Sequence, residues 1–348
     1  MDNLTVALAA LGGVVLAGIV AHGAWTARKA DPKRGLPRGR PTDFREPVLG
    51  DAPEPVAGGP DSASFPIERK LPKRSPARVD ALIDAIVVLN VDAPVSGEML
   101  IAHLPPTRRA GSKPFLIEGL NAETGEWEPP LAGQRYGEVQ AGVQLANRGG
   151  ALNEIEYSEF VQAIQPFSEA IGAMADFPDM LEVVARAREL DAFASQHDAQ
   201  LAVHLHARSS PWSVAYIQQH AGRHGFVPGL VPGRLVLPSA EEGAPPVLTL
   251  SFDSLKALDE HPQQAVVGDV TLSFDVPQTD LKADPFISWQ ASATALSLGM
   301  DAAIVDDNGQ PLTPQGFAVI GAELGQLYEA LEQRDLAAGS MPTRRLFS

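Results

Sequence analysis

The sequence predicts an α+β protein with an N-terminal transmembrane helix, a disordered tether and a folded body. Three observations support this: an uncharged apolar run at the N-terminus, a proline-rich stretch after it, and a remainder in which short β-branched runs alternate with amphipathic ones. A chain of 348 residues is long enough for two modest domains. We expect five segments: a transmembrane anchor (1–27), a linker (28–78), a first α+β unit (79–198), a second α+β unit (199–335) and a disordered tail (336–348).

The N-terminal run predicts where the protein resides. Leu4–Trp25 contains no Asp, Glu, Lys or Arg. As a helix it would cover roughly 33 Å, enough for the apolar core of a bilayer. The alternative is a cleaved signal peptide, which needs a basic start, whereas this chain begins Met1-Asp2-Asn3 and its positive charges follow the run from Arg28 onward. By the positive-inside rule we expect a single-pass bacterial inner-membrane protein with a periplasmic N-terminus and a cytoplasmic body.

The linker and the body differ sharply in charge. Residues 28–78 hold ten prolines without apolar periodicity, which is typical of an extended, disordered tether. This stretch carries 12 Lys and Arg against 7 Asp and Glu, whereas residues 79–348 carry 15 basic and 35 acidic residues. An acidic body argues against nucleic-acid binding. Its charge supports solubility and, as the alternative, a preference for partners with basic segments.

The first part of the body alternates strand-like and helix-like runs. Ala85–Val91 is short, apolar and β-branched, as a buried strand should be. Further strands are predicted at Pro114–Leu120, Val139–Asn147 and Phe160–Phe167. Asp179–His197 has apolar residues at helical spacing and predicts an amphipathic helix.

The same order then begins again, which suggests two degenerate copies of one α+β unit. The predicted helices are Val214–Gly225, Pro285–Met300 and Pro314–Gln333, and the predicted strands are Leu201–Ala207, Arg234–Pro238, Pro246–Phe252, Asp269–Pro277 and Ala302–Asp307.

No enzyme signature is found in the sequence. It contains no cysteine, which excludes disulfides, thiolate metal sites and cysteine nucleophiles, and it lacks the phosphate-binding loop, the dinucleotide fingerprint and the nucleophile elbow. His204 and His206 alternate on a predicted strand, and His220 and His224 lie four apart on a predicted helix. If strand and helix packed together, these imidazoles could bind zinc. We interpret them as ordinary histidines and expect no metal and no cofactor.

Several segments together resemble one family. Ala85–Val91 resembles the first strand, and Ser96–Leu100 the first helix start, of the bacterial cell division protein ZipA family, which ties the tubulin-like protein FtsZ to the inner membrane. Leu145–Asn147 and Val270–Pro277 resemble later strand ends of that family. Val305–Asp307, followed by Pro311–Pro314, resembles its closing strand, turn and capped last helix. The resemblance implies an antiparallel sheet with helices on one face. Because the body is about twice the length of the family's domain, it is either doubled in tandem or split by an insertion, and the repeated order favours doubling.

The resemblance also implies a binding groove. In the family, a helical peptide from the C-terminal tail of FtsZ lies in an apolar groove on the exposed sheet face. Arg148 and Ser273 stand where the family tends to be apolar. By match, the groove positions here are Ile86, Val88, Phe115, Ala146, Arg148, Thr271 and Ser273.

The expected function is therefore that of a non-enzymatic, membrane-anchored adaptor. It would bind the C-terminal tail of FtsZ and tether the division ring to the inner membrane during septum formation, with no nucleic-acid partner and no small-molecule substrate. The alternatives are a membrane-tethered scaffold for another cell-envelope protein and a histidine-based metal-binding protein.

Overall fold

The computed structural model of the chain describes residues 78–258 and 266–348. The predicted transmembrane anchor and almost all of the predicted linker lie outside these residues. Within them, no helix is long and apolar enough to cross a membrane.

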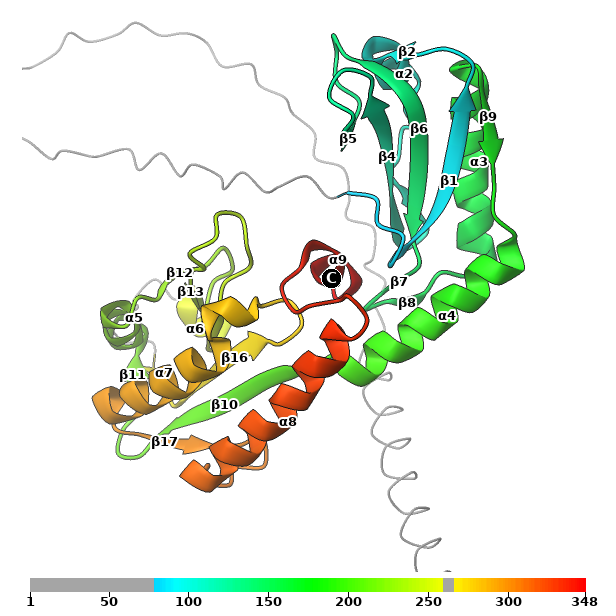
Figure 1. The fold of residues 1–348 in the computed structure, drawn as a ribbon. Helices are drawn as coiled ribbons and strands as arrows, with labels where there is room; N and C mark the ends of the chain where they lie inside the picture. Colours follow the sequence, from blue (N-terminus) through cyan, green and yellow to red (C-terminus); the bar gives the residue numbers. More distant parts are fainter. Residues whose placement is uncertain (1–77, 259–265) are drawn as a thin grey trace, which may run out of the picture. The chain divides into compact units, whose positions relative to one another are not determined.

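Residues 79–198 form an antiparallel sheet with helices on one face (Figure 1). Its strands are arranged in the order β3-β4-β6-β1-β9, with β2 paired to β6 and β5 to β4. The elements are β1 (Asp84–Val91), β2 (Val95–Ser96), α2 (Gly97–His103), β3 (Arg109–Ala110), β4 (Lys113–Asn121), β5 (Trp127–Glu128), β6 (Arg135–Gln144), β7 (Ala146–Asn147), β8 (Gly150–Ala151), α3 (Glu154–Ala170), β9 (Ala173–Asp176) and α4 (Met180–His197). We call the larger sheet of this part the first sheet.

Side-chain alternation decides which face of the first sheet is covered. In β1, Ala85, Val87 and Leu89 are fully buried in a core that also contains Phe160 of α3 and Ala187 of α4. The residues between them point to the opposite face, because successive side chains of a strand alternate. The first sheet therefore has a helix-covered face and an open face.

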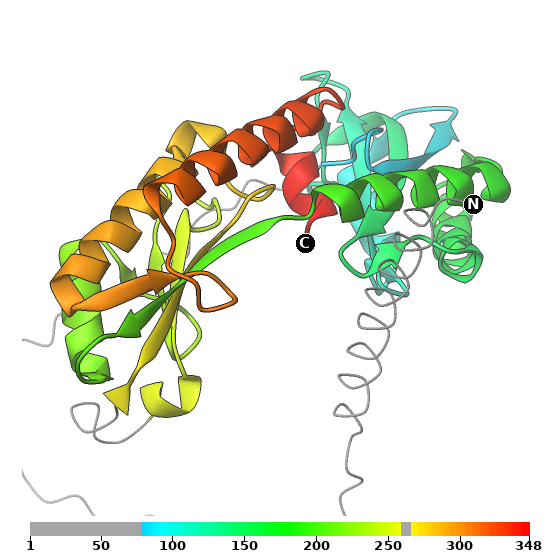
Figure 2. The ribbon, with the colours of Figure 1, turned by 90° about the horizontal axis from the view of Figure 1, so that it is seen from below.

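Residues from Gln200 onward build a second antiparallel sheet, in the order β12-β13-β14-β16-β10-β17, with a core of its own. The elements are β10 (Gln200–Ala207), β11 (Trp212–Ser213), α5 (Val214–Arg223), β12 (Val227–Pro228), β13 (Arg234–Leu237), β14 (Leu248–Ser251), α6 (Ser254–Ala257), β15 (Val266–Val267), β16 (Asp269–Asp275), η1 (Leu281–Ala283), α7 (Pro285–Met300), β17 (Ala302–Val305), α8 (Pro314–Glu332) and α9 (Met341–Leu346). We call this the second sheet. Figure 2 shows α7 running along it, where Trp289 packs edge-on against Phe274.

Two antiparallel sheets with helices confirm the α+β prediction at this level. Phe160–Phe167, predicted as a strand, lies instead within helix α3. Its apolar residues Phe160, Ile164 and Phe167 recur at helical spacing and are all buried. At the start of the helix, the Asn153 side chain accepts a hydrogen bond from the backbone N–H of Glu156, and the Glu156 side chain accepts one from the backbone N–H of Asn153. This capping box is a local signal that favours the helix.

The prediction of a disordered tail over 336–348 is wrong. These residues include helix α9, whose first turn is capped by the Ser340 side chain. Leu336, Leu346 and Phe347 are buried in the same core as β1 and β4. The apolar residues at the end of the chain thus fill a core most of whose other members lie more than 130 residues earlier, which no local pattern reveals.

Candidate functional site

The open face of the first sheet is an apolar surface with polar residues among its apolar ones. Ile86 of β1 and Leu116 of β4 both pair with Gly142 of β6, the strand between them, so their side chains lie on the same face. Val88 and Leu120 lie on this face too, because they are two and four positions further along the same strands. Met174 of β9 pairs with Asn90 and lies on the same side. Val88 is 42% exposed and Met174 is 78% exposed. We call this surface, defined by Ile86, Val88, Leu116, Leu120 and Met174, the first open face.

Acidic and amide side chains lie among these apolar residues. Val88 is flanked by Gln140 on one side and Asp176 on the other. Gln140 Nε2 donates to Glu118 Oε2 over 3.1 Å, and Glu118 Oε1 accepts from the backbone of Val79 over 3.1 Å. The surface therefore combines apolar area with acceptor groups and negative charge.

One end of the first open face is covered by the chain itself. A Cβ added to Gly142 would lie 2.7 Å from Cγ1 of Val79, so the Val79 side chain packs in the space left by that glycine. At the same end, the buried carboxylate of Asp84 accepts from Arg345 of α9. Burial raises the pKa of Asp84, an effect that the hydrogen bond and charge of Arg345 oppose. The uncovered part of the surface is centred on Val88 and Met174.

The structure separates the residues predicted to line one groove. Phe115 and Ala146 are fully buried in the first core, on the helix side of the sheet. Phe115 packs edge-on against Phe160 of α3 at 5.5 Å between ring centroids. Phe115 and Ala146 were both expected at the groove. In β4 the side chain on the same face as Ile86 is that of Leu116, because side chains alternate along a strand and Phe115 points to the core.

Arg148 is engaged in ion pairs. Its guanidinium donates to both carboxylate oxygens of Asp198 and lies 2.7 Å from Asp275. The hydrogen bond to Asp198 raises the pKa of Arg148 further above its ordinary value. The residue therefore ties the β7–β8 segment to these two carboxylates and does not lie on the first open face.

Thr271 and Ser273 lie on β16, in the second sheet, and so do not share a surface with Ile86 and Val88. Their partners across the strands are His204 and Ala202 of β10.

The residues that sequence reasoning missed are Leu116, Leu120 and Met174. Alternation within Pro114–Leu120 could have identified the first two, but Met174 joins the surface only through the pairing of β9 with β1.

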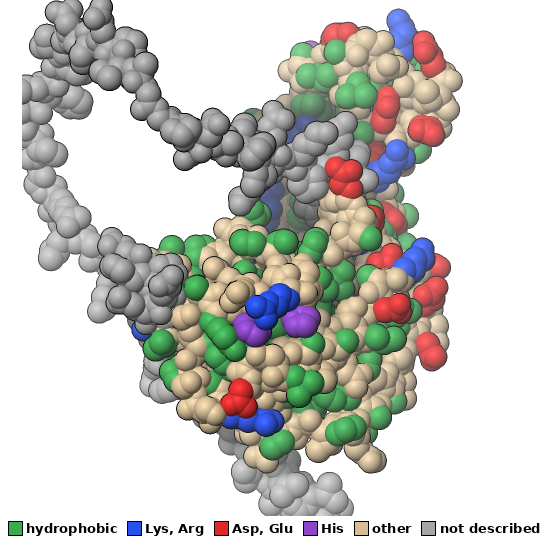
Figure 3. Space-filling model, turned by 90° about the vertical axis from the view of Figure 1, so that its left-hand side faces the viewer, with side chains coloured by type: hydrophobic (Ala, Val, Ile, Leu, Met, Phe, Trp, Pro, Cys, Tyr) green, Lys and Arg blue, Asp and Glu red, His purple; other side chains and the backbone are tan. Residues whose placement is uncertain are grey.

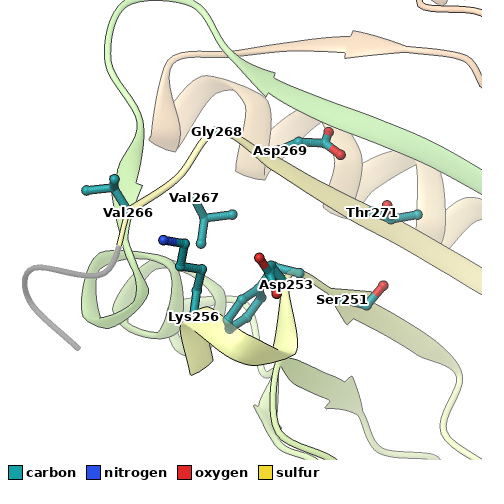
Figure 4. Close-up of a pocket in the computed structure, with 9 residues that line it drawn as sticks. Ser251, Asp253, Lys256, Val266, Val267, Gly268, Asp269 and Thr271 are labelled. Carbon is teal, nitrogen blue, oxygen red and sulfur yellow. The ribbon is translucent and has the colours of Figure 1, made fainter. Parts of the chain in front are cut away.

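The open face of the second sheet is polar. Thr271, Ser251 and Asp269 lie on it and also line a cavity of about 410 Å³ together with Asp253 and Lys256. Figure 4 shows these residues contributed by β14, by the α6 segment and by the β15–β16 segment. This surface carries charged and hydroxyl groups where the first open face carries aliphatic ones.

The predicted histidines fall in two places. His204 and His206 lie on the open face of the second sheet, because their neighbours Val203 and Leu205 belong to the core. His220 lies on α5 and His224 is the C-terminal cap of that helix, and the buried residues of α5 pack into that core from the helix side. Figure 3 views the side on which α5 lies and shows histidine side chains there beside a basic one.

The sheet therefore separates the two histidine pairs, and the four-histidine arrangement does not form. Burial, with the nearby charges of Arg223 and His224, lowers the pKa of His220.

Comparison of the chain with models of known protein families and with curated protein sequences finds no match.

Proposed function

We propose that the chain is a membrane-tethered, non-enzymatic adaptor whose first open face binds the C-terminal tail of FtsZ. The observation that carries the proposal is the presence of exposed aliphatic side chains, Val88 and Met174, on the uncovered face of an antiparallel sheet. An amphipathic peptide helix is recognised by laying its apolar side into such a surface. The membrane anchor in this proposal is the uncharged run Leu4–Trp25.

We further propose that the two sheets are tandem copies of one ZipA-like unit. The central strands pair in the same way: β1 lies between β6 and β9, and β10 lies between β16 and β17, all antiparallel. In each copy the helix after the first strand follows a two-residue strand and is capped by its serine, Ser96 in one and Ser213 in the other. The two long helices of each copy are also similar in length: α3 and α4 have 17 and 18 residues, and α7 and α8 have 16 and 19.

The strand registers identify equivalent positions in the two copies. Val88 pairs with Gln140 and Asp176, and its counterpart His204 pairs with Thr271 and Val305. The position that is aliphatic in the first copy is thus an imidazole in the second. This difference favours the first copy as the peptide-binding one.

The surroundings of Val88 suit a peptide that carries positive charge. Glu138 and Asp176 are exposed near the apolar residues, and opposite charges accelerate encounter more than they strengthen the final complex. Tethered copies facing a polymer with one tail per subunit would bind by avidity, so that a weak single contact suffices.

The test is a titration of a labelled C-terminal FtsZ peptide with the full-length chain, followed by fluorescence anisotropy. We expect saturable binding that Val88→Asp weakens by at least about tenfold, because the charge would be desolvated beneath an apolar peptide face. Thr271→Asp, on the second sheet, is the matched control and should leave the affinity unchanged. Circular dichroism checks that each variant is folded.

Absence of saturable binding by the folded wild-type chain would overturn the proposal. Binding that tolerates Val88→Asp but is lost with Thr271→Asp would move the peptide to the second copy.

A further inference from the structure

Two histidines and an aspartate converge on the open face of the second sheet. The ligand atoms of His204, His206 and Asp269 all lie within 4.8 Å of one another. His204 and His206 are two residues apart on β10 and so project from the same face. Asp269 is the direct partner of His206 across the strand pair, so the sheet register itself brings the three groups together.

The Asp269 carboxylate is positioned between the two rings. Its Oδ1 lies 3.0 Å from His206 Nε2, and its Oδ2 lies 3.7 Å from His204 Nδ1. A tetrahedral zinc ion with ligands at about 2.0–2.1 Å requires its ligand atoms to be roughly 3.3 Å apart. The two separations from Asp269 bracket that value, and no two of the three ligand atoms are more than 4.8 Å apart.

A second carboxylate orients His204. Asp307 Oδ1 lies 3.0 Å from His204 Nε2. An ionised carboxylate only accepts hydrogen bonds, so Nε2 carries the proton of the neutral ring and Nδ1 presents a lone pair. The Thr271 hydroxyl, 3.2 Å away, donates to that lone pair. A carboxylate that holds the remote N–H of a histidine is the usual outer-shell partner of a metal-bound imidazole.

Charge and access also fit a divalent cation. Two neutral imidazoles together with the carboxylates of Asp269 and Asp307 provide a formal charge of −2. The side chains of His206 and Asp269 are about half exposed, so an ion can enter. Asp269 and Thr271 also line the neighbouring cavity of about 410 Å³.

We propose that His204 Nδ1, His206 Nε2 and a carboxylate oxygen of Asp269 bind one divalent transition-metal ion of the zinc type, with Asp307 as the group that orients His204. On binding, the ion replaces the proton between His206 Nε2 and Asp269 and the contact of Thr271 with His204 Nδ1. Imidazole nitrogen with a single carboxylate suits zinc and its neighbours better than magnesium or calcium. The site lies on the second sheet and uses none of the residues of the first open face. It gives the second copy a ligand chemistry that the first copy, with Val88 at the position of His204, does not have.

The test uses the full-length chain without a histidine tag. Zinc is titrated by calorimetry, and Co²⁺ is added to report the ligand geometry through its visible absorption. We expect one ion per chain and a tetrahedral Co²⁺ spectrum. His206→Ala should weaken binding by at least about tenfold through loss of a ligand, and Asp307→Asn by about tenfold through loss of orientation.

The double variant His220→Ala with His224→Ala is the control, because it removes two imidazoles from α5 and its C-terminal cap, on the other face of the sheet, and should leave zinc affinity unchanged. Circular dichroism without metal verifies folding of each variant. A folded wild-type chain that binds no zinc would overturn the proposal, as would binding that survives His206→Ala but is lost in the α5 double variant.

Discussion

Arg345, in the last helix, donates two hydrogen bonds to the buried carboxylate of Asp84, in the first strand, over 2.6 and 2.8 Å. The Asp84 side chain is 0% exposed and that of Arg345 is 11% exposed. The same arginine also donates to the backbone oxygen of Arg78, and its own carbonyl accepts from Gln144. The end of the chain is thereby fixed to the beginning of the described body.

Replacing Arg345 by alanine would leave the Asp84 carboxylate buried without its partner. We expect the free energy of unfolding to fall by about 3–5 kcal/mol, measured by urea denaturation of the full-length chain. Arg188→Ala is the control, since its ion pair with Glu154 is exposed and should contribute less than about 1 kcal/mol. Equal losses in the two variants would contradict the structural role of Arg345.

Phe115 and Val88 test the assignment of faces. Phe115 is fully buried against α3, so Phe115→Ala should cost about 3–5 kcal/mol through lost contacts and the cavity that remains. Val88 is 42% exposed on the open face, so Val88→Ala should cost less than about 1 kcal/mol. Thermal or urea unfolding of both variants measures the difference. A small cost for Phe115→Ala would indicate that it lies on the surface, as the sequence resemblance implied.

Glu156 should make stability depend on pH in the acid range. Burial by itself would raise its pKa, but hydrogen bonds from Ser112 and Asn153, with the charge of Lys113, lower it below the ordinary 4.5. A carboxyl whose pKa is depressed on folding stabilises the protein above its unfolded pKa, and this contribution disappears as the pH falls through the folded value.

Glu156→Gln should therefore be destabilising at pH 7, and its difference from wild type should shrink as the pH falls below 4.5. Urea unfolding as a function of pH measures this, with the exposed Glu159→Gln on the same helix as the control. A difference that stays constant across that range would refute the linkage.

Tyr328 offers a stabilising substitution. Its hydroxyl oxygen is buried and has no hydrogen-bond partner among residues 78–258 and 266–348, and burial raises the pKa of Tyr328 to about 12. Removing an unsatisfied polar group should raise the free energy of unfolding, so we expect Tyr328→Phe to gain about 1 kcal/mol.

Tyr216→Phe is the comparison, because the Tyr216 hydroxyl donates to the carbonyl of Gly299 and its removal should bring no gain. Urea denaturation of both variants measures the change in the free energy of unfolding that each substitution causes. A loss of stability in Tyr328→Phe would mean that the hydroxyl is satisfied in solution.

Much of the local structure could be predicted from the sequence. The strand predicted at Ala85–Val91 is β1, and the apolar spacing in Asp179–His197 predicted helix α4. Phe160–Phe167 was misassigned because a short apolar run fits a buried strand and a helix equally well until its cap at Asn153 is considered. The N-terminal anchor remains a prediction.

The candidate surfaces were less predictable, because each depends on strand register. The family resemblance placed Ile86, Val88, Thr271 and Ser273 in one groove, whereas pairing puts β1 and β16 in different sheets. His204 and His206 were visible as a pair on one strand, but Asp269 and Asp307 join them only through the pairing of β10 with β16 and the turn after β17.

The α+β class, the periodicity of the helices and strands, and the side chains that share a face of each strand follow from the order of the amino acids alone. These properties depend on neighbours a few residues apart, which the backbone geometry relates directly. The choice of strand partners, the contact of Arg345 with Asp84, and the matching registers of Val88 in β1 and His204 in β10 depend on the tertiary structure. The pairings of β1 with β6 and of β10 with β16 join residues at least 50 positions apart, where the competing pairings differ in packing and hydrogen bonding and not in any local pattern.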